Sequence, residues 1–154
     1  MQKKDKKQAL IQAQNICSKT EKCKKDIRIK LKSWGICEEE TDEIIEDLIH
    51  EDFINEKRFV SSFTNEKLRI LKWGKIKIMF ALKQKGISEE NISHAMNKIP
   101  KDEYLTIIFK ELEKKAKSIS AKNEAERKNK LIRFGMSRGY EQDICFNFVI
   151  PDQK

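Results

Sequence analysis

The sequence predicts an all-α protein of three tandem three-helix repeats that form an elongated, curved array. The first observation behind this prediction is a pattern of a basic helix end, a Gly and a large apolar residue, which occurs three times. Its glycines are Gly35, Gly86 and Gly139, separated by 51 and 53 residues, and repeats of about this length are typical of modular arrays. The second observation is that two valines and no alternation of apolar and polar residues leave little from which to build a sheet. Third, 38% of the residues are charged, which suits small units that each bury little surface.

The first unit, residues 1–50, is predicted to hold a short first helix, a basic second helix and an acidic third helix. Apolar residues three or four positions apart mark the buried face of each helix. Gly35 suits the left-handed conformation that commonly ends a helix, and acids at the start of the third helix favour its N-terminus. The apolar positions are Leu10, Ala13, Ile16 and Cys17, then Ile27, Leu31 and Trp34, then Ile44, Ile45, Leu48 and Ile49.

The second and third units, residues 51–100 and 101–154, repeat this order. With the same offsets, Ile27 corresponds to Ile78 and Leu131, so the apolar faces repeat together with the glycines. Pro100 and Pro151 each follow the predicted last helix of their unit, where a helix should stop. The first helices are marked by Phe59, Val60, Phe63 and Leu68 in the second unit, and by Leu105, Ile108, Phe109, Leu112 and Ala116 in the third.

Composition disfavours several classes of protein. No apolar run approaches the roughly 20 residues of a transmembrane helix, and residues 1–7 lack the apolar core of a signal peptide, so we expect a cytoplasmic protein without a membrane partner. The four cysteines contain no Cys-x-x-Cys pair, and both histidines lie far from them in sequence. We therefore expect reduced thiols packed between helices, and neither a metal nor a cofactor. No paired carboxylates, activated nucleophile or phosphate-binding Gly loop indicates an enzyme.

The net charge of +8 hides a segregation of charge. Residues 38–52 contain nine acids and neither Lys nor Arg; the role of this segment stays open, with a solvated helix face as the favoured interpretation. The basic residues recur on the middle helices of the second and third units. Lys and Arg placed repeatedly along an elongated scaffold predict a track for a polyanion or for an acidic groove.

Five stretches of the chain match one family pattern. Residues 52–60 (Asp-Phe-Ile-Asn-Glu-Lys-Arg-Phe-Val), 73–78 (Trp-Gly-Lys-Ile-Lys-Ile) and 82–87 (Leu-Lys-Gln-Lys-Gly-Ile) resemble the central repeat of the RecX family, the bacterial regulators of the RecA recombinase. Residues 130–134 and 137–140 resemble its C-terminal repeat, and the resemblance extends over residues 9–150. The chain departs from the pattern at Val60, at Asn55-Glu56 and at Gly135. We expect Gly135 to weaken its helix by up to about 1 kcal/mol relative to Ala.

The resemblance implies a non-enzymatic protein that lodges in the helical groove of the recombinase filament on single-stranded DNA and restrains ATP hydrolysis and strand exchange. The residues themselves leave open whether the effect on recombination is inhibitory or stimulatory. We expect a monomer with weak direct DNA binding. The alternative is a general helical nucleic-acid-binding protein that acts on DNA or RNA without a filament partner. The candidate contact residues are Arg58, Lys67, Arg69, Lys72, Lys75, Lys77, Lys83, Lys85, Arg127, Lys128, Lys130, Arg133 and Arg138.

Two of these expectations concern particular positions. Arg58 has an alternative role, because it stands beside Phe59 after an acidic turn and could pair with Asp52 or Glu56 to fix the junction between units. Lys72, Lys75 and Lys77 lie around a turn and the start of a helix, where we expect their side chains to be exposed.

Overall fold

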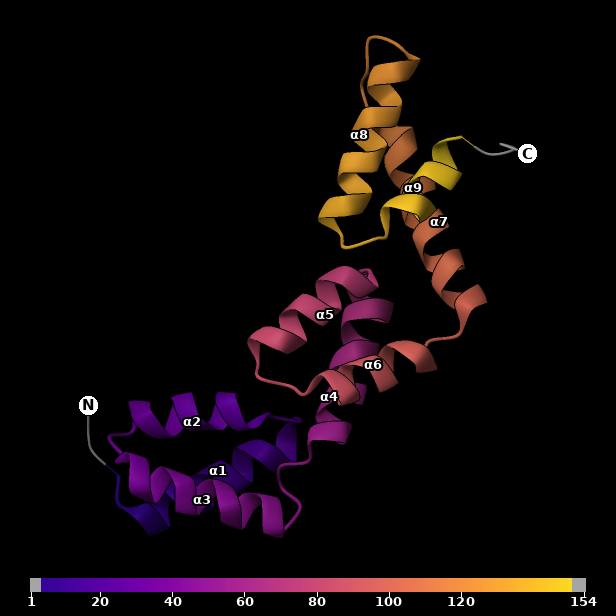
Figure 1. Ribbon diagram of the computed structural model, residues 1–154. Helices are drawn as coiled ribbons and strands as arrows, with labels where there is room; N and C mark the ends of the chain where they lie inside the picture. Colours follow the sequence, from indigo (N-terminus) through magenta and orange to yellow (C-terminus); the bar gives the residue numbers. More distant parts are fainter. Residues whose placement is uncertain (1–3, 151–154) are drawn as a thin grey trace.

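The computed structural model describes residues 4–150, and every regular element in that range is a helix (Figure 1). We group these helices in threes, in chain order. The first group is α1 (Lys6–Lys19), α2 (Lys24–Ser33) and α3 (Glu38–His50); the second is α4 (Glu56–Asn65), α5 (Lys75–Gln84) and α6 (Glu89–Lys98); the third is α7 (Lys101–Ser118), α8 (Glu124–Ser137) and α9 (Gln142–Val149). A π-helical turn, η1 (Glu66–Ile70), extends α4.

The three groups are strung out in chain order. Figure 1 shows α1–α3 at the lower left, α4–α6 in the middle and α7–α9 at the upper right. The accessible surface of the chain is 10203 Å², whereas a compact monomer of its mass would expose about 8,100 Å². The prediction of an elongated all-α repeat array is therefore confirmed.

The three repeat glycines end α2, α5 and α8 in the same way. Gly35, Gly86 and Gly139 have φ angles of 79°, 76° and 89°, which is the left-handed region. In each case the N–H of the next residue donates to a carbonyl five positions earlier, the bond of a Schellman motif. The pairs are Ile36 to Leu31 at 3.1 Å, Ile87 to Leu82 at 3.2 Å and Tyr140 to Gly135 at 3.0 Å. The role predicted for these glycines is confirmed.

The first helix is longer than expected. We predicted a short helix around Leu10 to Cys17, but α1 has 14 residues. Its extra turn starts at Asp5, whose side chain accepts a hydrogen bond from the Gln8 N–H while the Gln8 side chain accepts one from the Asp5 N–H. This capping box stabilises a polar first turn that has no apolar periodicity to reveal it.

The buried side chains form two clusters instead of three. One cluster lies within the first group and includes Ile27, Leu31 and Ile44. The other is continuous through the second and third groups, from Phe59 to Cys145, and also receives Cys23 from the start of α2. The second and third groups therefore share a core, and the first is joined to them by Cys23 and by polar contacts.

Two glycines bring the second and third groups into backbone contact. The Gly74 N–H donates to the Arg138 carbonyl at 2.7 Å, and the Ile76 N–H donates to the Gly139 carbonyl at 3.0 Å. A Cβ on Gly74 would lie 2.2 Å from the Gly139 carbonyl oxygen, so no side chain fits there. The lack of a side chain on Gly74 therefore allows this junction.

Both tyrosines of the chain are buried at the same junction. The Tyr140 hydroxyl donates to the Lys72 carbonyl at 2.6 Å, and the Tyr104 hydroxyl accepts from the Lys75 N–H at 2.8 Å and donates to Glu141. Burial raises the pKa of Tyr140 to about 12. Burial, followed by the hydrogen bond to Glu141, raises the pKa of Tyr104 still further.

Gly135 packs against α9, so it affects stability through packing as well as through its low helix propensity. A Cβ at this position would lie 2.4 Å from the Cys145 sulfur, so Ala does not fit unless that side chain or α9 shifts. The expected cost of Gly in the helix stays a prediction, and the close approach of α8 and α9 adds a packing term that opposes a larger residue here.

Two further points concern the chain as a whole. Among the described residues, no helix combines the length and the apolar character needed to cross a bilayer. Pro151, which we expected to stop the last helix, lies outside the described residues.

Candidate interaction surface

Basic side chains of the second group gather around Trp73, in the turn between η1 and α5. The Nζ atoms of Lys77 and Lys67 lie 4.5 and 5.1 Å from the centroid of the Trp73 ring. The Nζ atom of Lys75 lies 4.8 Å from the Tyr104 ring centroid. Ammonium groups are attracted to aromatic faces, which holds these long side chains in place. We call Lys67, Lys72, Trp73, Lys75 and Lys77 the Trp73 cluster.

The backbone of Lys72 shows how the cluster is fixed. Its φ of 60° is left-handed, which is uncommon for a residue with a side chain. The turn is held on both sides, because the Trp73 N–H donates to the Lys67 carbonyl at 2.8 Å and the Lys72 carbonyl accepts from Tyr140. The position of the cluster therefore depends on the junction between the second and third groups.

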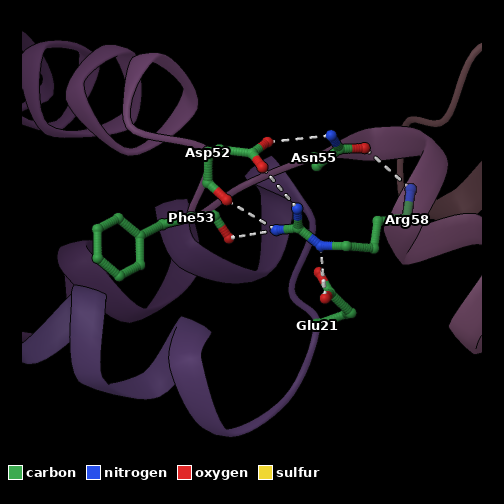
Figure 2. Close-up of polar contacts among 5 residues, drawn as sticks. All are labelled: Glu21, Asp52, Phe53, Asn55 and Arg58. Atoms are coloured by element: carbon green, nitrogen blue, oxygen red, sulfur yellow. Dashed lines mark hydrogen bonds and ion pairs between the residues drawn. The ribbon is translucent and has the colours of Figure 1, made fainter.

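Arg58 lies at the junction between the first and second groups (Figure 2). Its Nε donates to Glu21 at 2.7 Å, its Nη1 to the Asp52 carboxylate at 3.0 Å, and its Nη2 to the carbonyls of Asp52 and Phe53 at 2.8 and 3.4 Å. The hydrogen bond to Glu21 is the main cause of a raised pKa of Arg58. Of the two partners we considered, Asp52 is present, and Glu21 takes the place we had given to Glu56. These contacts are the ones expected if Arg58 fixes the junction between the first two units.

Six more candidates also form ion pairs. Lys85 pairs with Asp26 of α2 at 2.8 Å, a second link between the first two groups. Burial acts to raise the pKa of Asp26, but hydrogen bonds from Lys85 and Cys23 outweigh burial and lower it. The other pairs are Lys67 with Glu66, Arg69 with Glu103, Lys83 with Glu89, Lys130 with Glu126, and Arg138 with Glu111.

The remaining six candidates take part in no ion pair with any residue between 4 and 150. They are Lys72, Lys75, Lys77, Arg127, Lys128 and Arg133. Lys72, Lys75 and Lys77 are half-buried, so our expectation that they are exposed is wrong. The turn packs against the third group, where Lys75 lies over the Tyr104 ring and Lys77 lies beside Gly139. Their ammonium groups remain without a carboxylate partner among the described residues, which makes them available to an anion.

Sequence reasoning missed a second basic site, a groove between α4 and α6. Lys57, Arg69, His94 and Lys98 line this groove, and no carboxylate lines it among the described residues. The Thr64 hydroxyl lies at its wall, buried and without a hydrogen-bond partner in the described structure. The four-residue spacing of His94 and Lys98, which puts both on one face of α6, was the signal available in the sequence.

Sequence reasoning also missed an apolar groove between α2 and α5. Ile29, Trp73, Phe80 and Ala81 form its apolar lining. The side chains of Ile29 and Phe80 are 61% and 64% exposed, which is unusual for large apolar residues.

Within residues 4–150, no three His, Cys, Asp or Glu side chains gather closely enough to hold a metal ion. Cys17, Cys23 and Cys145 are buried as the packing interpretation requires, and burial raises the pKa of Cys145 to about 11. Cys37 differs, because it is exposed at the start of α3.

An elongated array of three-helix units with cation-rich surfaces belongs to the class of modular helical-repeat proteins. The family model described as "RecX, second three-helix domain" matches residues 55–96, and "RecX, third three-helix domain" matches residues 102–149. The chain belongs to the RecX family.

Curated relatives have the name of the same family. Regulatory protein RecX of Clostridium perfringens (strain 13 / Type A) is 32% identical over 133 residues, which cover 85% of this chain and 62% of the relative. Regulatory protein RecX of Clostridium tetani is 36% identical over 124 residues, which cover 79% of this chain and 56% of the relative. The chain thus spans about three fifths of the length of these relatives.

Solved structures share the fold. The crystal structure of RecX from Lactobacillus salivarius superposes with a TM-score of 0.80 at 24% identity and covers 94% of both chains. A second crystal structure of regulatory protein RecX gives a TM-score of 0.83 at 20% identity, covering 94% of this chain and 70% of that one. At these identities the likeness supports the repeat architecture.

Proposed function

We propose that this chain is a regulatory protein that binds a RecA-type recombinase filament in its helical groove and inhibits its ATPase and strand-exchange activities. Membership of the RecX family is the observation that supports this proposal most strongly. The protein would act by binding instead of by catalysis, as a cytoplasmic monomer without a cofactor.

The shape and charge of the molecule are compatible with such a partner. An elongated array of repeats can follow a helical groove along its length (Figure 1). A filament on single-stranded DNA offers both protein carboxylates and phosphates, and a surface rich in Lys and Arg complements either. The acidic residues of α3 are mostly exposed and would face basic parts of the filament or solvent.

The candidates divide into two proposed roles. The six cations without an ion-pair partner among the described residues would make the principal contacts with the filament. The seven paired cations would mainly hold the groups in register, because their guanidinium or ammonium groups are already engaged within the chain. Surface ion pairs are weak, so a strong anionic partner could still recruit some of them. The principal set is Lys72, Lys75, Lys77, Arg127, Lys128 and Arg133.

Co-sedimentation with filaments separates the proposed function from its alternative. A RecA-type recombinase assembled on oligo(dT) should pellet the wild-type chain at physiological salt and lose ATPase activity, whereas bare oligo(dT) should bind the chain far more weakly. Tight binding to bare oligo(dT), with a salt slope near −0.7 for each phosphate contacted and no effect on the ATPase, would instead favour the general nucleic-acid-binding protein.

A triple substitution tests the Trp73 cluster. Lys72, Lys75 and Lys77 are changed together to Gln, which keeps much of each half-buried stem but removes its charge. Filament binding and ATPase inhibition should both weaken. The matched control changes three exposed lysines of α7, Lys110, Lys114 and Lys117, to Gln and should leave both measurements near wild type. Equal losses in the two variants would show that net charge matters and the cluster does not.

A further inference from the structure

The apolar groove between α2 and α5 has the features of a protein-docking site. Its two most exposed apolar side chains, Ile29 and Phe80, come from different groups of helices and lie on one groove. Phe80 follows Ile29 by 51 residues, which is the spacing of Gly35 and Gly86, so both occupy the same place in their repeats. A monomeric soluble protein that exposes paired large apolar side chains in a concave surface commonly uses them to bind a partner.

The walls of this groove are fixed before any partner arrives. The Lys25 Nζ of α2 donates to the Gln84 carbonyl at the end of α5 at 2.6 Å, and Lys85 pairs with Asp26 at 2.8 Å. Arg58 further ties the first group to the second. A preformed groove loses little conformational entropy on binding, so its apolar contacts contribute more fully to affinity.

The rim of the groove is basic. Lys25, Lys77 and Lys85 line it together with one acid, Asp26, which is already paired with Lys85. The charge that remains is positive, so an acidic partner is complementary and a basic one is excluded.

The aromatic geometry favours a protein partner over nucleic acid. Single-stranded DNA binds by stacking bases on open aromatic faces. Here the ammonium groups of Lys67 and Lys77 lie over the Trp73 ring, and Ile29 offers no aromatic face at all. An aliphatic or aromatic side chain can pack between Ile29 and Phe80, whereas a run of bases cannot stack there.

We propose that the α2–α5 groove docks an acidic protein segment of the recombinase filament, with one large apolar side chain of that segment packed between Ile29 and Phe80. This inference rests on the proposed function, since the filament supplies the segment. The groove extends the surface of the Trp73 cluster, since Trp73 and Lys77 belong to both. In this extension apolar contact provides affinity and the lysines select an acidic sequence.

Two single variants and one matched control test the groove. Ile29→Ser and Phe80→Ser should each weaken binding to a recombinase filament on oligo(dT) by about tenfold or more, as expected for a central apolar anchor. Ile11→Ser is the control, because Ile11 is a 57% exposed side chain of α1 that does not line the groove. All three variants should keep the wild-type helix content and melting temperature, since each side chain is exposed, and the control should bind like wild type.

Several results would overturn the inference. Wild-type affinity in both groove variants would overturn it while the proposed function stands. A parallel loss of affinity for bare oligo(dT) would assign the groove to nucleic acid, and a dimer of the free wild-type chain that Phe80→Ser dissociates would assign it to a second copy. Failure of the wild-type chain to bind the filament at all would overturn the proposed function as well.

Discussion

Gly86 and Gly139 occupy the same place in their repeats and share a left-handed backbone, yet their surroundings differ. A Cβ on Gly86 would meet no other atom within 4 Å. A Cβ on Gly139 would lie 2.3 Å from the Lys77 Cβ and 2.5 Å from the Lys77 backbone nitrogen. The repeated Gly thus reflects the left-handed backbone alone at Gly86, and both the left-handed backbone and close packing at Gly139.

Replacing each glycine by Ala separates these two effects. Gly86→Ala should cost about 1–2 kcal/mol of unfolding free energy, the usual penalty for a left-handed L-residue. Gly139→Ala should cost clearly more, because the new methyl group collides with the backbone of α5. Urea denaturation followed by helix content measures both. Equal losses of unfolding free energy in the two variants would show that the junction between α5 and α8 accommodates the methyl group by a small movement.

The two buried tyrosines provide a direct report on the same junction. Folding raises the pKa of Tyr140 to about 12, while an unfolded tyrosine titrates near 10. The neutral phenol is therefore favoured in the folded state, so its contribution to stability is complete below pH 10 and is lost as the pH rises towards 12.

A titration followed by tyrosinate absorbance tests this expectation. In denaturant both tyrosines should ionise with a midpoint near pH 10. In the native chain ionisation should be delayed to higher pH and should coincide with loss of helix content. Native ionisation near pH 10 with full helix content would show that the phenols are not buried as described.

At the scale of single elements, α8 and α9 depend on a Gly–Cys contact. Gly135→Ala should lower stability, although Ala is the better helix former by about 1 kcal/mol, because its Cβ would lie 2.4 Å from the Cys145 sulfur. Cys145→Ala removes that sulfur, so the double variant should be more stable than the sum of the two single changes predicts. Thermal melting of the four proteins gives the coupling energy. Simple additivity would argue against the contact.

The turn between α3 and α4 depends on the hydrogen bonds of the Arg58 guanidinium group. Arg58→Lys keeps the charge but cannot reach Glu21, Asp52 and the two carbonyls together, so the urea midpoint should fall. Arg28→Lys is the matched control, because Arg28 makes a single bond to Asp42 within the first group. A similar midpoint shift in both variants would mean that the junction does not depend on the several hydrogen bonds of the guanidinium group.

At the scale of the whole molecule, the array should behave as an elongated particle in solution. A compact globule of 154 residues would have a radius of gyration of about 15 Å. Small-angle scattering should give a larger value, because the three groups follow one another instead of packing around one centre (Figure 1). A value near 15 Å would mean that the first group folds back onto the others.

The sequence by itself determined the fold class, the repeat and the ends of the middle helices. Apolar periodicity and left-handed glycines are local properties, so three copies in register were sufficient to place α2, α5 and α8 with their Schellman ends. The resemblance of residues 52–60, 73–78 and 82–87 to the RecX family was visible for the same reason. The basic positions could also be listed from the sequence, but the sequence did not show which of them form ion pairs within the chain.

Only the tertiary structure decided which cations are engaged and which surfaces are concave. Arg58 pairs with Glu21, 37 positions away, and Gly74 packs against the backbone of Gly139. Ile29 and Phe80, from two groups of helices, line one groove. Each of these arrangements brings together segments that are separate in sequence, and its geometry follows from how the groups pack. Helical periodicity indicates which face of a helix is apolar, whereas packing determines whether that face becomes part of the core, a junction or a docking groove.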